Sequence, residues 1–135
     1  MSADARALRV LVVEDEPVNR ALLRAVLTGS VGARLGPIEF TESESLAAAR
    51  AAVADQAPDV VILDVRLPDG SGLDLLRELL PAGVAGRPFV IVMSASVLPA
   101  DRDAARRSGG DAFLGKPFSP ADLVALVATR VPARR

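Results

Sequence analysis

The chain alternates between short apolar runs and longer segments in which apolar residues recur every three or four positions. Three runs are nearly continuous and rich in Val, Ile and Leu: Leu8–Val13, Val60–Leu63 and Phe89–Met93. Such runs are typical of strands that are buried on both faces of a parallel sheet. Ile38–Thr41 alternates apolar and polar residues, which suits an edge strand, and Ala112–Leu114 is a short fifth candidate.

The segments between these runs have helical spacing. The first carries two rows of residues spaced by four: Val18, Leu22 and Val26, and Asn19, Leu23 and Leu27. Further helices are expected over Ser43–Gln56, around Leu73, Leu76 and Leu80, over Ala100–Ser108 and from Ser119 onward. Ser43 or Ser45 is expected to cap the second helix, and Ser119, before Pro120, the last one.

Five β–α units in succession predict an α/β fold. Right-handed crossovers would place helices on both faces of a doubly wound, five-stranded parallel sheet. A chain of 135 residues suits one domain, so residues 1–135 are expected to form a single unit. The loosest stretch is Thr28–Pro37, which has three glycines and one proline.

Composition excludes several classes of function. The absence of cysteine excludes disulfide scaffolds and thiolate chemistry, and the absence of histidine excludes Ser-His-Asp catalysis and imidazole ligation. A net charge of −1 does not favour nucleic acid or a membrane surface as a partner. No apolar run has the length of a membrane span or a leader peptide, so a cytoplasmic location is expected.

Polar residues follow the apolar runs at the ends where a doubly wound sheet binds its ligands. Glu14 and Asp15 follow the first predicted strand. Asp64 follows the third predicted strand and Ser94 the fourth, and Lys116, the only lysine, follows the fifth. Carboxylates that converge in this way repel one another unless a cation lies among them. Oxygen ligands without histidine or cysteine favour a hard ion such as Mg²⁺.

This set of groups suits transfer of a phosphoryl group to a carboxylate, in which catalysis consists mostly of positioning and charge neutralisation. The divalent ion and Lys116 would offset the phosphoryl charge, and Ser94 would donate a hydrogen bond to it. Because the chain has no histidine, the phosphoryl donor must be another molecule.

Four motifs, each following a predicted strand, carry a family resemblance: Val-Leu-Val-Val-Glu-Asp-Glu-Pro (10–17), Asp-Val-Val-Ile-Leu-Asp-Val-Arg-Leu-Pro-Asp-Gly-Ser-Gly-Leu (59–73), Val-Ile-Val-Met-Ser-Ala (90–95) and Asp-Ala-Phe-Leu-Gly-Lys-Pro-Phe (111–118). In these motifs the chain resembles the receiver domain of two-component response regulators, of the single-domain, chemotaxis-regulator type. The resemblance implies a flavodoxin-like (βα)5 fold with strand order 2-1-3-4-5.

The resemblance also implies roles for the residues that bind metal and phosphoryl group. Asp64 would be the phosphoacceptor, and the cofactor would be Mg²⁺ or Mn²⁺. Asp15 would bind the ion directly and Glu14 mainly through water, with Asp64 and the main-chain carbonyl of Arg66 as further ligands. Glu14 stands where Asp is commoner in the family, which lengthens that side chain by one methylene. Lys116 would pair with the phosphoryl oxygens.

A conformational switch is implied at Ser94 and Phe113. Ser94 would move toward the phosphoryl group on Asp64, and Phe113, which lacks a tyrosine hydroxyl, would turn inward to fill the space. The fourth helix has only Ala104 and Ala105 to bury, so it is expected to move readily. The output surface would be the fourth helix, the fifth strand and the fifth helix.

The resemblance implies a histidine kinase or a histidine phosphotransfer protein as phosphoryl donor. Asn19 and Arg20, with Pro117-Phe118, are the candidates for donor docking, and Arg66 and Ser96 should line the path of an attacking water. The signal would pass to a downstream effector protein or to an output domain of the same protein. Direct contact with nucleic acid or a membrane is not expected, and the chain would be a monomer or a phosphorylation-linked dimer.

Several alternatives stay open at this point. The chain could be a receiver cut from a larger regulator or hybrid kinase, or a receiver that docks without phosphorylation. A haloacid-dehalogenase-like phosphatase would need a second Asp where Arg66 stands. A flavodoxin-like flavin module would need a phosphate-binding loop where the acidic Glu14–Glu16 lies. The preferred interpretation is a switch that gains and loses its own phosphoryl group rather than an enzyme of repeated turnover.

Overall fold

The computed structural model of the chain describes residues 7–79, 86–96 and 98–131. Its main sheet has five parallel strands: β1 (Leu8–Val13), β2 (Ile38–Ser43), β3 (Val60–Asp64), β6 (Phe89–Ser94) and β7 (Ala112–Gly115). They lie in the order β2-β1-β3-β6-β7. Because β6 and β7 are the fourth and fifth strands of this sheet along the chain, the predicted order 2-1-3-4-5 is confirmed. A small antiparallel hairpin, β4 (Arg66–Leu67) and β5 (Gly70–Ser71), lies between β3 and the next helix.

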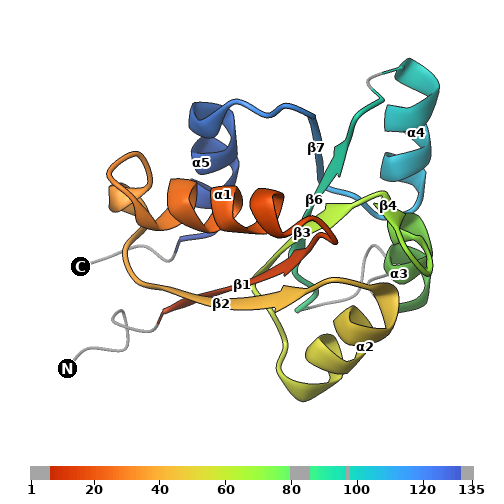
Figure 1. Cartoon of the computed structure of the whole chain (residues 1–135), viewed down its shortest axis with the longest axis horizontal. Helices are drawn as coiled ribbons and strands as arrows, with labels where there is room; N and C mark the ends of the chain where they lie inside the picture. Colours follow the sequence, from red (N-terminus) through yellow and green to blue (C-terminus); the bar gives the residue numbers. More distant parts are fainter. Residues whose placement is uncertain (1–6, 80–85, 97, 132–135) are drawn as a thin grey trace.

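Five α-helices in the described part of the chain cover the two faces of the sheet: α1 (Pro17–Thr28), α2 (Leu46–Asp55), α3 (Gly72–Leu79), α4 (Pro99–Arg107) and α5 (Pro120–Ala128). Helices α1 and α5 pack on one face, and α2, α3 and α4 contribute to the core on the other (Figure 1). The architecture is therefore the predicted doubly wound α/β fold. Among the described residues, no helix has the length and apolarity needed to cross a membrane.

Each central strand supplies side chains to both cores because successive residues of a strand point to opposite faces. In β1, Val10 and Val12 join the core under α1 and α5, whereas Leu11 and Val13 join the core under α2 and α3. All four are almost fully buried. This two-sided burial explains why the strand is a continuous apolar run rather than an alternating one.

The beginning of α2 is held by two acceptors. The Ser45 hydroxyl accepts a hydrogen bond from the Ala48 amide, so Ser45 is the cap, and Ser43 instead ends β2 in a buried position. The carboxylate of Asp69, in the turn between β4 and β5, accepts hydrogen bonds from the amides of Leu46 and Ala47 at 2.8 and 3.1 Å. The bond from Leu46 is the main reason that the pKa of Asp69 lies below its usual value.

Two features of the first half of the chain are not evident from its sequence. The two rows of α1 do not both reach the core, because a helix on a sheet buries one face: Val18 and Leu22 are 76% and 48% exposed. The stretch Thr28–Pro37 is less loose than its composition implies. It contains a 3-10 helix, η2 (Ala33–Leu35), whose Leu35 is 1% exposed. Leu80, expected in the third helix, lies outside the described residues.

Candidate functional site

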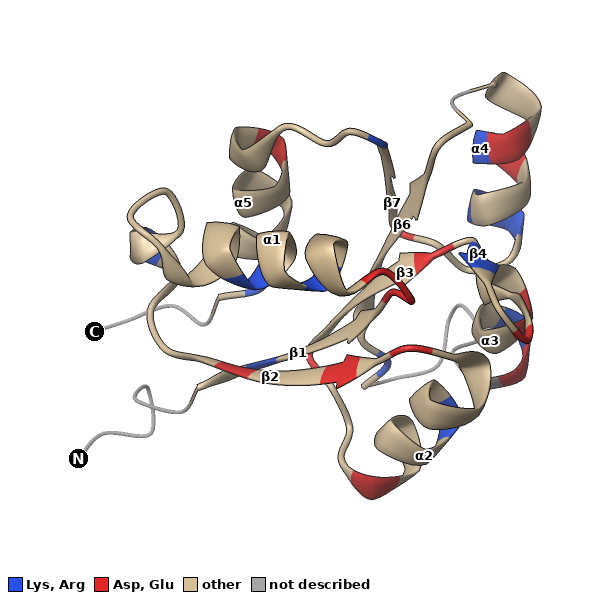
Figure 2. Ribbon diagram, in the orientation of Figure 1, with Lys and Arg blue, Asp and Glu red and all other residues tan. Residues whose placement is uncertain are grey.

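The predicted polar residues lie together at the carboxyl ends of adjacent strands. Asp64 is the last residue of β3, next to β6, which ends at Ser94. Ser94 in turn pairs with Gly115 of β7, and Lys116 follows at once. On the other side of β3, β1 ends at Val13, so Glu14 emerges beside Asp64. Figure 2 shows acidic residues gathered where β1 and β3 end, near the start of α1.

Lys116 connects the two sides of this site. Its Nζ donates hydrogen bonds to Oε1 of Glu14 and Oδ2 of Asp64, both at 2.9 Å. Both carboxylates are buried, at 2% and 8% exposed. Burial by itself would lower the pKa of Lys116, but its hydrogen bonds and charge attraction to Asp64 and Glu14 outweigh that effect, so its pKa is raised. The lysine is therefore a fixed cation between two buried anions.

Glu14 is held more firmly than the sequence indicated. Its Oε2 accepts a hydrogen bond from the Glu16 amide at 3.0 Å, and its Oε1 also accepts one from Asn19 Nδ2 at 3.4 Å. Its main-chain carbonyl accepts a bond from Arg20 Nη1 at 2.8 Å. Asn19 and Arg20, expected at an interface, thus support the acidic loop. The intervals of five and six residues give no sequence signal for this, because it depends on how the loop turns into α1.

Asp64 is oriented by the chain that follows it. Its Oδ1 accepts a hydrogen bond from the Arg66 amide at 3.3 Å, which leaves Oδ2 for Lys116. The chain then returns through the β4–β5 hairpin, and the Gly72 amide donates to the Val65 carbonyl at 2.7 Å. A Cβ on Gly72 would lie 2.2 Å from the Asp64 carbonyl oxygen, so only glycine fits there. The Pro-Asp-Gly turn and this glycine together fix the aspartate.

The residues present fit a hard cation. Glu14, Asp15 and Asp64 each offer one carboxylate oxygen, and these three atoms lie within 4.8 Å of one another. All three ligand atoms are oxygens, which Mg²⁺ and Mn²⁺ prefer. The single ammonium of Lys116 contacts two of the three carboxylates, so a net negative charge remains for a cation to offset.

The acidic cluster opens into a surface cavity. Its lining residues follow or end the strands β1, β3, β6 and β7: Asp15, Asp64, Arg66, Ser94, Ala95, Ser96 and Lys116. The Ser94 hydroxyl accepts a hydrogen bond from the Ser96 amide at 3.1 Å. Since an amide can only donate, the hydroxyl hydrogen of Ser94 stays available for an acceptor in the cavity.

Phe113 lies beside this site rather than within it. It is half-buried in β7 and lines a second cavity that also reaches Ser94, Leu73 and Ala104. The guanidinium of Arg102, on α4, lies over its ring at 5.1 Å from the centroid. The sequence reasoning missed Arg102, because no motif or interval marks a contact that arises from packing α4 on β7.

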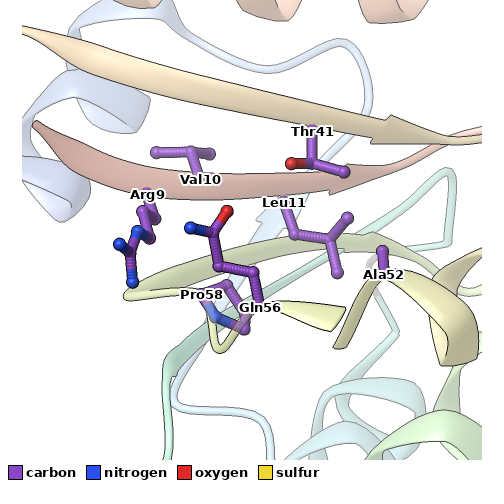
Figure 3. A pocket seen from close by; sticks show the side chains of 7 residues that line it. All are labelled: Arg9, Val10, Leu11, Thr41, Ala52, Gln56 and Pro58. Carbon is purple, nitrogen blue, oxygen red and sulfur yellow. The ribbon is translucent and has the colours of Figure 1, made fainter. Parts of the chain in front are cut away.

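A separate hollow near the amino end of β1 has none of this chemistry. Arg9 and Gln56 lie at one end of it and Leu11 and Ala52 at the other (Figure 3). Its volume is about 10 Å³, against about 550 Å³ for the cavity at Asp64. Ligand pockets typically have roughly 300–1,000 Å³. The acidic cavity is therefore the candidate site.

Comparison with known proteins shows a family match over most of the chain. Residues 10–128 match the model of the response regulator receiver domain family. The chain is 39% identical over 126 residues to the KDP operon transcriptional regulatory protein KdpE of Escherichia coli, covering 93% of the chain and 51% of that protein. It is 35% identical over 123 residues to the two-component response regulator ORR41 of Oryza sativa, covering 91% and 94%. The chain thus spans about half the length of KdpE but nearly all of ORR41.

A solved structure with a similar fold holds a magnesium ion. The receiver domain of a sensor histidine kinase from Pseudomonas aeruginosa, solved with a magnesium ion coordinated in its active site cleft, superposes with a TM-score of 0.76. It is 27% identical to the chain, and the match covers 95% of the chain and all of that domain.

Proposed function

The chain belongs to the response regulator receiver domain family of two-component systems, and from this premise we propose that its Asp64 accepts a phosphoryl group from a phosphohistidine of a partner protein. The single observation that supports the proposal best is the Lys116 ammonium, 2.9 Å from Asp64 in a cavity that also contains the Ser94 hydroxyl. Family membership also sets aside the phosphatase and flavin alternatives.

The transfer follows from the groups around Asp64. A carboxylate oxygen of Asp64 forms a bond to phosphorus while the bond from phosphorus to the donor nitrogen breaks. The electron pair of that bond stays on the imidazole of the partner. The new acyl phosphate carries about −1.5 to −2 charge, and Lys116 is already positioned to offset part of it. Ser94 donates its free hydroxyl hydrogen to a phosphoryl oxygen.

Glu14, Asp15 and Asp64, with the main-chain carbonyl of Arg66, would hold Mg²⁺ or Mn²⁺. When bound, such an ion neutralises charge on the transferring phosphoryl oxygens and orients them. In this chain Glu14 also contacts Lys116, so the same carboxylate serves both cations. Lys116 and Ser94 would contact the phosphoryl group on Asp64 directly.

The response to phosphorylation starts at Ser94 and Phe113. Movement of Ser94 toward the phosphoryl group would enlarge the cavity that it shares with Phe113, and the ring would turn into that space. The surface formed by α4, β7 and α5 would change with it. Ser94, Phe113 and this surface would thus have two arrangements in equilibrium, and the phosphoryl group would shift the equilibrium toward one of them.

The donor protein would dock beside the site, on α1 and the loop after β7. A groove there is lined by side chains of both segments and of β6: Asn19, Leu22, Leu23, Met93, Lys116, Pro117 and Phe118. Val18 and Leu22 expose apolar surface on the same helix. A histidine kinase or histidine phosphotransfer protein would present its phosphohistidine here, and the receiver would pass its signal to an effector protein or an output domain.

Intact-mass measurement after incubation with Mg²⁺ and acetyl phosphate tests the proposal. The wild-type protein should gain the mass of one phosphoryl group, and the gain should require Mg²⁺. Asp64→Asn should abolish it, whereas Asp55→Asn, at the exposed end of α2, should not. A phosphoryl gain that persists in Asp64→Asn, or no gain in the wild-type protein, would refute the proposal.

A further inference from the structure

A chain of hydrogen bonds leads from the phosphoryl-binding hydroxyl to α4. The Ser96 amide donates to the Ser94 hydroxyl at 3.1 Å, and the Ser96 hydroxyl donates to Oδ2 of Asp101 in the first turn of α4. An ionised carboxylate only accepts, so the hydrogen of the Ser96 hydroxyl is committed to Asp101. The lone pairs of that hydroxyl oxygen remain free for a donor.

The two side chains line adjoining cavities beside Asp64. Ser96 lines the cavity of the acidic cluster with Asp64 and Arg66. Asp101 lines the adjoining cavity, which shares Arg66, Ser94 and Ser96 with the first. Asp101 is exposed, so water reaches this place from the solvent.

We propose that Asp101 is a positioning residue for hydrolysis of the acyl phosphate, and that it acts through Ser96. This inference rests on the proposed function of Asp64. With its hydrogen held by Asp101, the Ser96 oxygen accepts a hydrogen bond from the attacking water and turns a lone pair of that water toward phosphorus. The negative charge of Asp101 strengthens this acceptance, since hydrogen bonds to polarised hydroxyls are cooperative.

The hydrolytic step is balanced without any further reactant. The water oxygen forms a bond to phosphorus as the bond between phosphorus and the Asp64 oxygen breaks, and its electron pair returns to the Asp64 carboxylate. The proton that the water loses passes to the departing inorganic phosphate. Asp101 takes up no proton, and its role is to fix the orientation of the Ser96 hydroxyl.

A purely structural role for Asp101 is the competing explanation. The residue before α4, Leu98, caps the helix without any side-chain hydrogen bond, and in that explanation the bond from Ser96 to Asp101 would brace its first turn. The two roles differ in what they affect. A brace would alter the protection of α4 and the initial rate of phosphoryl loading, whereas positioning of water would alter only the rate at which the phosphoryl group is lost.

The test measures phosphoryl lifetime by intact mass after loading with acetyl phosphate and rapid removal of the donor. Asp101→Ala and Ser96→Ala should each lengthen the lifetime about fivefold, the effect of one net hydrogen bond. The double variant should match Ser96→Ala, because Asp101 acts through Ser96. Asp101→Asn, which keeps an acceptor but no charge, should fall between the wild type and Asp101→Ala. Asp103→Ala, which removes an equal charge and a pairing with Arg106 on the same helix, should leave the lifetime unchanged.

The initial rate of loading and the amide exchange of α4 should stay constant across these variants. An unchanged or shorter lifetime in Asp101→Ala would overturn the inference, as would additive effects in the double variant or a lifetime change that tracks α4 protection. Failure of the wild-type protein to load at all would instead refute the proposed role of Asp64.

Discussion

Helices α1 and α4 both start at the carboxyl edge of the sheet, one after the acidic loop and the other after Ser94, but they are attached to the sheet in different ways. In α1, Leu23, Val26 and Leu27 are buried. In the described part of α4, only Ala105 is. Full burial of a Leu or Val side chain contributes about 1.5–3 kcal/mol, and a single methyl group about 0.8 kcal/mol. Apolar burial therefore stabilises the packing of α1 on the sheet by several kcal/mol more than that of α4.

The difference matches the parts that the two helices would play. A donor protein needs a firm surface, and α1 offers exposed Val18 and Leu22 on a helix whose other face is anchored in the core. A switch needs an element that moves for a small change in free energy, and α4 meets that need. The size of the buried side chains would thus separate the proposed donor-binding side of the site from its proposed output side.

The largest effect on stability should come from truncating a buried side chain of α1. Leu23→Ala in α1 should lower the free energy of unfolding by about 2–5 kcal/mol, because it removes a large buried side chain and leaves a cavity. Ala105→Gly in α4 should cost about 1–2 kcal/mol, from one buried methyl group and the lower helix propensity of glycine. Urea unfolding of both variants measures the difference.

Leu22→Ala is the matched control, since it makes the same chemical change one position away on the half-exposed face of α1. Its effect should stay within about 0.5 kcal/mol, as for most surface substitutions. Equal losses in Leu23→Ala and Ala105→Gly would remove the contrast between the two helices.

Amide exchange with and without a phosphoryl mimic sharpens the comparison. Beryllofluoride with Mg²⁺ should change protection in α4 several-fold and leave the second half of α1 as it was, because only α4 is free to respond. Asp64→Asn should abolish the change. Equal protection of α4 in the two states would contradict the assignment of α4 to the output surface.

The fold was largely predictable because buried strands and covering helices differ in the period of their apolar residues. The apolar runs mark β1 correctly and end one residue before β3 and β6 do, since those strands end at the site residues Asp64 and Ser94. The hairpin β4–β5 was not predicted, because two-residue strands are too short to show a period. The gathering of the acidic residues and Lys116 was predictable, since parallel strands end at the same edge.

The contacts that surround the site were not predictable in the same way. Nothing in the sequence indicates that Asp69, 23 residues from Leu46, accepts a hydrogen bond at the start of α2. Asp101 and Arg102 contact a loop and a strand through the packing of α4, which depends on the whole fold rather than on local spacing. The roles of Asp64, Ser94 and Phe113 in phosphorylation and switching stay predictions.

The smallest effect isolates one type of contact that both helices make. Arg102 of α4 lies over Phe113 at 5.1 Å, and Arg24 of α1 lies over Phe40 at 4.7 Å. A cation–π contact contributes about 0.5–1 kcal/mol at exposed sites. Because α4 has few other anchors, Arg102→Ala should raise amide exchange in α4 about 2- to 5-fold in the unphosphorylated protein. Arg24→Ala removes a similar contact and an ion pair to Glu42, yet exchange in α1 should hardly change, because its buried leucines still hold it. If both helices respond alike, the contact itself and not the anchoring controls local opening, and the contrast between α1 and α4 fails.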